Sequence, residues 1–331
     1  MDRVASPIKL SRRAALALTA AGVSVPVAGA KPSVTQMAFD PLDPQQNLSM
    51  FMKLQYSLVK EPVHGYFGGL MFAQEGDLPL RLLLAYDGYG QGWVEPQLNG
   101  SYKLAWKEIG LLKDPETGAY LDVWRNPLTN EDVRIKHIGN PAANSLLTAS
   151  ERASTPGFLT GNVDMPPRNY RRPNDPKLAN AFVLPWQTLG DYTSVWNDAR
   201  LAMNHTLDPK IWVRESSGER ISITEFFQLV ARTNELFDPN RKSVMYTGSW
   251  VRIASWHPWM YMGQRPGKLV YRASTQRLTG PEQLPGAFLS EIKRRSPEYL
   301  VSPEAWGPRF STWKDFFSKN KPLPIDAKPP L

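Results

Sequence analysis

The stretch from Tyr102 to Ile138 constrains the fold more strongly than any other part of the chain, because short alternating segments and tight turns follow one another there. The segments span 102–109, 120–124 and 132–138, and the turns span 114–118 and 125–130. Short strands joined by tight turns are typical of antiparallel meanders. Thirty prolines and 23 glycines argue against an all-helical chain. The sequence therefore predicts a mainly β fold, either an antiparallel barrel or a strongly curved meander sheet, with a few peripheral helices.

Further strands are predicted on either side of this stretch. Residues 62–72 and 268–272 have the residue types of strands, and Asp87-Gly-Tyr-Gly90 is predicted to be a turn. No linker separates two hydrophobic cores. We therefore expect residues 31–331 to form a single β-rich domain.

A few segments have helical patterns. Ser222 and Glu225 have the spacing of a capping box, so residues 222–231 are predicted to form a helix. Helices are also predicted near residues 48–54, at 288–295 and in the C-terminal tail.

Residues 1–30 have the features of an export signal rather than of a folded element. Arg12 and Arg13 precede a short apolar run, and Ala28-Gly-Ala30 is a small-x-small cleavage site. The paired arginines favour twin-arginine export, while an ordinary secretory signal or an uncleaved anchor remains the alternative. We expect a cleaved leader and a periplasmic or secreted protein that uses the twin-arginine export machinery, without stable membrane insertion.

The segment 246–262 is the main candidate for a ligand site, because it holds three of the eleven tryptophans. Read with a period of two, one face of a strand carries Tyr246, Gly248, Trp250, Arg252, Ala254 and Trp256. Pro258 is expected to end the strand, or to cause a bulge in it, just after His257. Indoles beside a guanidinium suit the wall of a cavity that binds a flat apolar ring. A packed core in which Arg252 pairs with a carboxylate is the alternative.

Several titratable side chains are candidates for proton transfer. His64 and His137 lie on predicted strands, and His257 follows the aromatic strand. For each histidine, the alternative is a satisfied core or surface side chain. A second polar and aromatic cluster contains Tyr192, Trp196 and Arg200, which would be i, i+4 neighbours on a helix; an ordinary surface helix is its alternative.

The sequence also excludes or disfavours several classes of site. There is no cysteine, which excludes disulfides, thiolate catalysis and cysteine-bound metal centres. No phosphate loop, dinucleotide fingerprint, serine elbow or zinc-protease motif occurs. The net charge is +8, of which +3 lies in residues 1–30, so the remainder carries only +5. We predict no metal, no cofactor and no nucleic-acid partner.

Two stretches resemble a known family. Asp114-Pro-Glu-Thr-Gly-Ala-Tyr-Leu-Asp-Val-Trp-Arg-Asn-Pro-Leu-Thr-Asn130, followed by His137-Ile-Gly-Asn-Pro141, is the more specific of the two. The other is Phe39-Asp-Pro-Leu-Asp-Pro-Gln-Gln-Asn47. With the leader, they resemble the bacterial exported domain-of-unknown-function family eighteen thirty-eight over roughly residues 39–317. The resemblance implies export and a single domain, and it transfers no catalytic residue.

The preferred hypothesis is an exported, cofactor-independent enzyme of lyase, isomerase or hydratase type that acts on a small aromatic or polycyclic apolar compound. Trp250, Trp256 and Trp259 would stack on the ring, with Tyr246, Tyr192 and Trp196 as further binding residues. His257, His137 or His64 would move the proton, and Arg252 or Arg200 would stabilise an oxyanion. The first alternative is a periplasmic carrier for a hydrophobic small molecule. The second is a carbohydrate-active protein, which would require paired carboxylates in one groove.

Overall fold

The computed structural model describes residues 39–150, 169, 174–175, 177–303, 305 and 312–331. Residues 36–331 form a compact unit of their own, distinct from residues 1–35. The leader predicted at residues 1–30 lies outside the described residues, so its export function stays a prediction.

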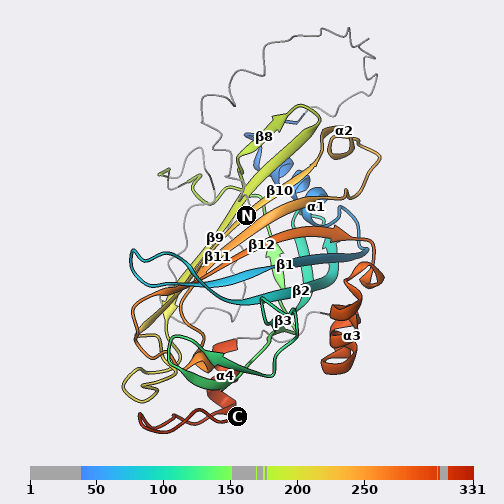
Figure 1. Cartoon of the computed structure of the whole chain (residues 1–331). Helices are drawn as coiled ribbons and strands as arrows, with labels where there is room; N and C mark the ends of the chain where they lie inside the picture. The colour runs from blue at the N-terminus through green and yellow to red at the C-terminus, as the bar shows by residue number, and fades with distance from the viewer. Residues whose placement is uncertain (1–38, 151–168, 170–173, 176, 304, 306–311) are drawn as a thin grey trace, which may run out of the picture. The chain divides into compact units, whose positions relative to one another are not determined.

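The unit is built on one antiparallel sheet of ten strands, which is a curved meander rather than a barrel (Figure 1). Its strands are β1 (Pro62–Gln74), β2 (Arg81–Pro96), β3 (Tyr102–Lys113), β6 (Ile138–Asn140), β7 (Ser145–Leu147), β8 (Trp186–Leu189), β9 (Tyr192–Asn204), β10 (Arg220–Arg232), β11 (Thr247–Ala254) and β12 (Lys268–Leu278). Their order is β6-β3-β2-β1-β12-β11-β10-β9-β8, with β7 also paired to β3. In the described part of the chain, the end strands β6 and β8 do not pair, so the predicted barrel alternative is not supported.

Two meanders therefore make up the sheet. Strands β1 to β3 form one, and β8 to β12 form the other. The pairing of β1 with β12 joins them, from His64 opposite Leu278 to Gln74 opposite Lys268. A separate hairpin, β4 (Val123–Asn126) and β5 (Glu131–Arg134), follows β3.

The helices are short and peripheral, as predicted. They are α1 (Pro44–Gln55), α2 (Thr233–Leu236), α3 (Gly286–Arg295) and α4 (Thr312–Lys319), with single 3-10 turns η2 (Pro258–Met260), η3 (Pro281–Gln283) and η4 (Pro297–Leu300). The side chain of Asp43 caps α1 by accepting hydrogen bonds from the backbone N–H groups of Gln45 and Gln46.

Three sequence-based predictions of local structure are wrong. Residues 87–90 do not form a turn, because they lie in the middle of the 16-residue strand β2. Residues 222–231 are not a helix but most of strand β10. The segment 192–200 is also extended, in β9. In the last two, alternating β-branched and aromatic side chains pack on a sheet, and this tertiary packing outweighs the local helical spacing.

The sheet has two differently covered faces. The face that carries Trp250 and Arg252, here called the pocket face, packs against α1 at one end and against the β4–β5 hairpin and η2 at the other. The opposite face packs against α3 and η4 through Tyr89, Phe288 and Ile292. A hollow remains on the pocket face between the two core clusters that cover it.

Glycines of β2 allow aromatic rings to lie directly on the strand. A Cβ atom built on Gly88 would overlap with the ring of Phe67, and one on Gly90 would overlap with the ring of Trp106. Neither glycine has a positive φ, so the constraint is the space that the rings occupy rather than backbone conformation. The flat rings form part of the floor of the hollow.

A buried carboxylate fixes the opposite face. Asp87 accepts hydrogen bonds from Tyr66 Oη at 2.7 Å, Tyr120 Oη at 2.7 Å and Lys113 Nζ at 2.5 Å. Burial raises the pKa of Asp87, but these three donors outweigh it and hold the pKa below the usual 3.8. Phe288 of α3 packs against both tyrosine rings, so this carboxylate supports the docking of α3.

We predict that Gly90→Ala destabilises the protein by about 1–3 kcal/mol, because the new methyl group must displace the Trp106 ring. The matched control is Gly65→Ala. Gly65 pairs with Gly90 across β1 and β2, but its Cβ would lie 3.7 Å from the nearest atom. Urea unfolding of both variants measures the difference. Equal stability of the two would contradict the ring-on-glycine contact.

Asp87→Asn is expected to lower the free energy of unfolding at pH 7 by at least about 2 kcal/mol, since it leaves Lys113 without its buried partner. The folded-state pKa of Asp87 is depressed, so its stabilisation is present above pH 3.8 and lost as the pH falls below that value. The difference between wild type and variant should therefore shrink on acidification in urea unfolding measured from pH 6 to pH 3. Asp77→Asn, at an exposed loop position, is the control. A difference that does not depend on pH would refute this role of Asp87.

Candidate functional site

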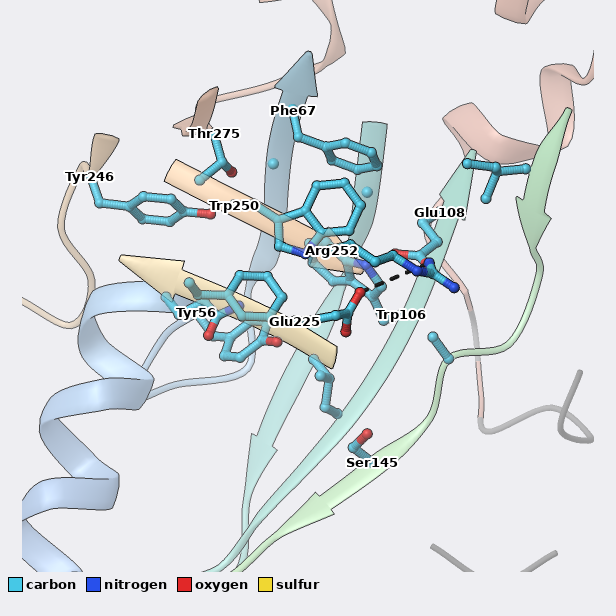
Figure 2. A pocket seen from close by; sticks show the side chains of 17 residues that line it. Tyr56, Phe67, Trp106, Glu108, Ser145, Glu225, Tyr246, Trp250, Arg252 and Thr275 are labelled. Atoms are coloured by element: carbon cyan, nitrogen blue, oxygen red, sulfur yellow. Dashed lines mark ion pairs between the residues drawn. The ribbon is translucent and has the colours of Figure 1, made fainter. Parts of the chain in front are cut away.

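A cavity of about 270 Å³ occupies the hollow on the pocket face (Figure 2). Its walls combine aromatic rings with a few charged groups. The lining residues are Gln55, Tyr56, Gly65, Phe67, Gly90, Leu104, Trp106, Glu108, Ile138, Ala143, Ser145, Glu225, Phe227, Tyr246, Trp250, Arg252 and Thr275. A cavity of this size holds a small organic molecule of one or two rings.

Strand register brings the charged groups together. Arg252 of β11 lies opposite Glu225 of β10, and Trp250 lies opposite Phe227 two positions away. Glu108 of β3 reaches the same cavity from the other meander, where it pairs with Gly90. Figure 2 shows Arg252 extending between the two glutamates. The site therefore depends on both meanders.

The two carboxylates have different surroundings. Arg252 Nη1 lies 3.9 Å from Glu225 Oε1, an ion-pair contact that is too long for a hydrogen bond. Burial raises the pKa of Glu108, and the charge of Glu225 raises it further. Arg252 and the side-chain hydrogen bonds of Asn140 and Trp106 oppose this shift but do not cancel it. Glu108 therefore stays protonated to a higher pH than an ordinary glutamate does.

A second, smaller cavity of about 40 Å³ lies beside the first and shares Arg252 and Ile138 with it. Its other walls are Leu112, Lys136, His137, His257 and Trp259. His137 Nδ1 accepts a hydrogen bond from the backbone N–H of Leu112 at 3.0 Å. Burial, and then the charge of Arg295, lowers the pKa of His137 to about 4, so this imidazole is neutral at pH 7.

His257 is deeply buried behind the first cavity rather than inside it. Its Nε2 lies 2.5 Å from Tyr271 Oη, and its ring stacks on Trp259. Burial, followed by the charge of Arg252, lowers its pKa to about 3. The strand ends at Ala254, three residues before the predicted position, and Pro258 begins η2. An imidazole with so low a pKa is a weak base at neutral pH.

The predicted site residues separate into three groups. Tyr246, Trp250 and Arg252 line the large cavity, and Arg252, His137, His257 and Trp259 line the small one. The remaining predicted residues, Trp256, His64, Arg200, Tyr192 and Trp196, lie in neither.

Each of those remaining residues has another environment. Trp256 is buried in the core, where its indole N–H donates to the carbonyl of Arg265 at 2.8 Å. His64 stacks on Tyr89, and its Nδ1 lies 2.7 Å from the Tyr89 hydroxyl on the face opposite the cavity. Arg200 is exposed, as are Tyr192 at 49% and Trp196 at 42%. The predicted helical cluster of Tyr192, Trp196 and Arg200 therefore forms no part of the cavity.

Sequence reasoning missed several residues of the cavity. Trp106 and Glu108 share one face of a correctly predicted strand, yet nothing local indicates what that face contacts. The capping-box spacing predicts a helix-capping role for Glu225, although Phe226 and Phe227 next to it favour a strand. The alternation of Ile221, Ile223 and Glu225 was the available signal for a pocket-facing carboxylate.

No group of three histidine, aspartate or glutamate side chains with metal-site geometry occurs among the described residues. Within the same residues, none of the helices has both the length and the apolar character needed to cross a membrane.

Together, the fold and the site define an antiparallel β-sheet protein with an aromatic cavity that contains an arginine and two glutamates. The chain belongs to the family described as "Protein of unknown function (DUF1838)", whose model matches residues 61–321. This confirms the family predicted from the sequence, while its description as bacterial and exported stays a prediction. No curated protein matches the chain significantly.

We predict that Glu108→Gln stabilises the protein relative to wild type increasingly as the pH rises. A carboxyl group whose folded-state pKa is raised binds more protons in the folded state than in the unfolded state, so stability falls as the pH rises above 4.5. The neutral glutamine removes this penalty. Urea unfolding at pH 4, 5.5 and 7 measures the trend. Glu116→Gln, at an exposed turn after β3, is the control. A constant difference across these pH values would contradict the buried environment of Glu108.

Proposed function

We propose that this protein is a cofactor-independent enzyme of isomerase, lyase or hydratase type, and that it acts on a small ring compound in the large cavity. The observation that carries the proposal is the placement of Glu108, Arg252 and Glu225 in one aromatic-walled cavity. Groups with such different environments provide an acid, a cation and a carboxylate within reach of one ligand.

The aromatic walls support binding of a flat ring. Trp250, Phe67 and Phe227 form one cluster, with ring centroids of Phe67 and Trp250 separated by 5.6 Å and those of Phe227 and Trp250 by 6.4 Å. Such rings offer large apolar contact area with few polar demands. Tyr56 and Tyr246 add hydroxyl groups to the lining at the end near α1 (Figure 2).

The charged groups support acid–base chemistry. In the proposed mechanism, Glu108 donates a proton to the substrate as general acid, because burial keeps it protonated above its ordinary pKa. Glu225, beside Arg252, accepts a proton from substrate carbon, and Arg252 stabilises negative charge that develops on a substrate oxygen. Carboxylates rather than the predicted histidines carry the acid–base roles in this mechanism, because His137 and His257 line only the small cavity and have lowered pKa values.

The test compares binding with turnover. Ring compounds that raise the melting temperature of wild type are incubated with wild type, Glu108→Gln and the control Glu116→Gln, and products are identified by mass spectrometry. We expect Glu108→Gln to bind the same compounds within a few fold and to turn them over about 10²–10⁴ times more slowly. Glu116→Gln should behave as wild type.

A carrier gives a different result in the same experiment. If wild type binds ring compounds and returns every one unchanged, the protein is a binding protein for hydrophobic small molecules. If Glu108→Gln turns a substrate over at the wild-type rate, the proposed general acid is wrong.

A specific observation also favours carbohydrate hydrolysis as a second candidate. That hypothesis requires two carboxylates facing one groove beside aromatic rings, and Glu108 and Glu225 both line the cavity with Trp106 and Trp250. Release of nitrophenolate from 4-nitrophenyl glycosides would support it, provided that both Glu108→Gln and Glu225→Gln abolish the release. Absence of release over a panel of such glycosides would reject it.

A further inference from the structure

Two buried N–H donors beside the small cavity have no acceptor in the part of the chain that the structure describes. Among the described residues, Arg252 Nε and His137 Nε2 are both buried without a hydrogen-bond partner. Because Leu112 N–H donates to His137 Nδ1, the hydrogen of the neutral imidazole is on Nε2. Both atoms are therefore donors, and a buried donor without a partner destabilises the folded state.

The guanidinium has further capacity. Its contact with Glu225 is 3.9 Å long, so Arg252 is not saturated by that carboxylate. Arg252 also lies over the ring of Tyr271, 5.8 Å from the ring centroid, in a cation–π contact that supplies no oxygen acceptor. An arginine in such surroundings has a planar pair of donors ready for a bidentate oxygen ligand.

The lining of the small cavity suits an anionic group. None of the described residues that line it is a carboxylate, while Lys136, Arg252 and His137 all contribute to its wall. Lys136 is already paired with Asp315 at 2.5 Å, so it adds positive surroundings rather than a free donor. The volume of about 40 Å³ exceeds the roughly 10–15 Å³ that one water requires, which leaves room for a group of carboxylate size.

The geometry points to a ring-bearing carboxylic acid as the substrate class: the ring lies in the large cavity, and the carboxylate binds Arg252 and His137 Nε2 beside the small one. This inference rests on the proposed function, because the carboxylate belongs to the same substrate whose ring is proposed to bind in the large cavity. Arg252 and Ile138 line both cavities, so a ligand that contacts Arg252 from the large cavity lies next to the small one. The acid group would supply the acceptors that both donors lack.

The experiment compares an acid with its neutral counterpart. Isothermal titration calorimetry at pH 7 measures the dissociation constants of 1-naphthoate and 1-naphthamide, which share a ring system and differ in charge. We expect wild type to bind naphthoate at least tenfold more tightly. Arg252→Gln should reduce the preference to near unity, and His137→Gln, which retains an acceptor for Leu112 N–H, should reduce it several fold. His64→Gln, on the opposite face of the sheet, should leave it unchanged.

The outcomes separate the two proposals. Equal binding of acid and amide by wild type overturns the carboxylate subsite while the ring-binding cavity stands. A preference for naphthoate that survives both Arg252→Gln and His137→Gln also overturns it, since the acid then binds elsewhere. If folded wild type binds neither compound, the ring-binding cavity fails together with the subsite. If one variant does not fold, the other still tests where the acid binds, and an unchanged preference in that variant overturns the subsite.

Discussion

The contact of two aromatic rings with the backbone of β2 is the steric constraint on which the site depends. Phe67 and Trp106 come from the strands on either side, and each ring lies over a glycine of the strand between them. Any side chain at Gly88 or Gly90 would fill the space that the rings use. No side chain projects from these two glycines, so the middle of the pocket face is a hollow. The two core clusters on either side of it therefore leave a cavity between them.

Electrostatics within this cavity depend on one cation. Arg252 is the only lysine or arginine that lines the large cavity in the described part of the chain, and it stands between Glu108 and Glu225. Without it, two carboxylates would share a partly apolar space and repel each other. Its charge also helps to keep His257 neutral. Arg252 thus lowers the pKa of Glu108 on one side and of His257 on the other, although burial has the larger effect on both.

Local sequence patterns were sufficient for much of the fold. Alternation identified the strand that carries Trp250 and Arg252, and helical spacing identified α1 and α3. The prediction of a turn at Gly88-Tyr89-Gly90 is wrong because each glycine leaves space for an aromatic ring from a neighbouring strand. A local sequence pattern contains no information about that ring. The helix-cap prediction for Glu225 is wrong because its cross-strand partner, Arg252, is 27 positions away in the sequence. Register between distant strands decides which side chains meet, and the sequence alone does not fix that register.

The pairing of β1 with β12 has a consequence for how the chain matures. One edge of β1 has no partner strand until residues 268–278, which form β12, have left the ribosome. During that interval the hydrogen-bonding groups of β1 on that side are open to incorrect partners. Closure of so long a loop also slows the search for the native arrangement. A nascent chain of this protein therefore exposes an unpaired edge of β1 until β12 has been synthesised.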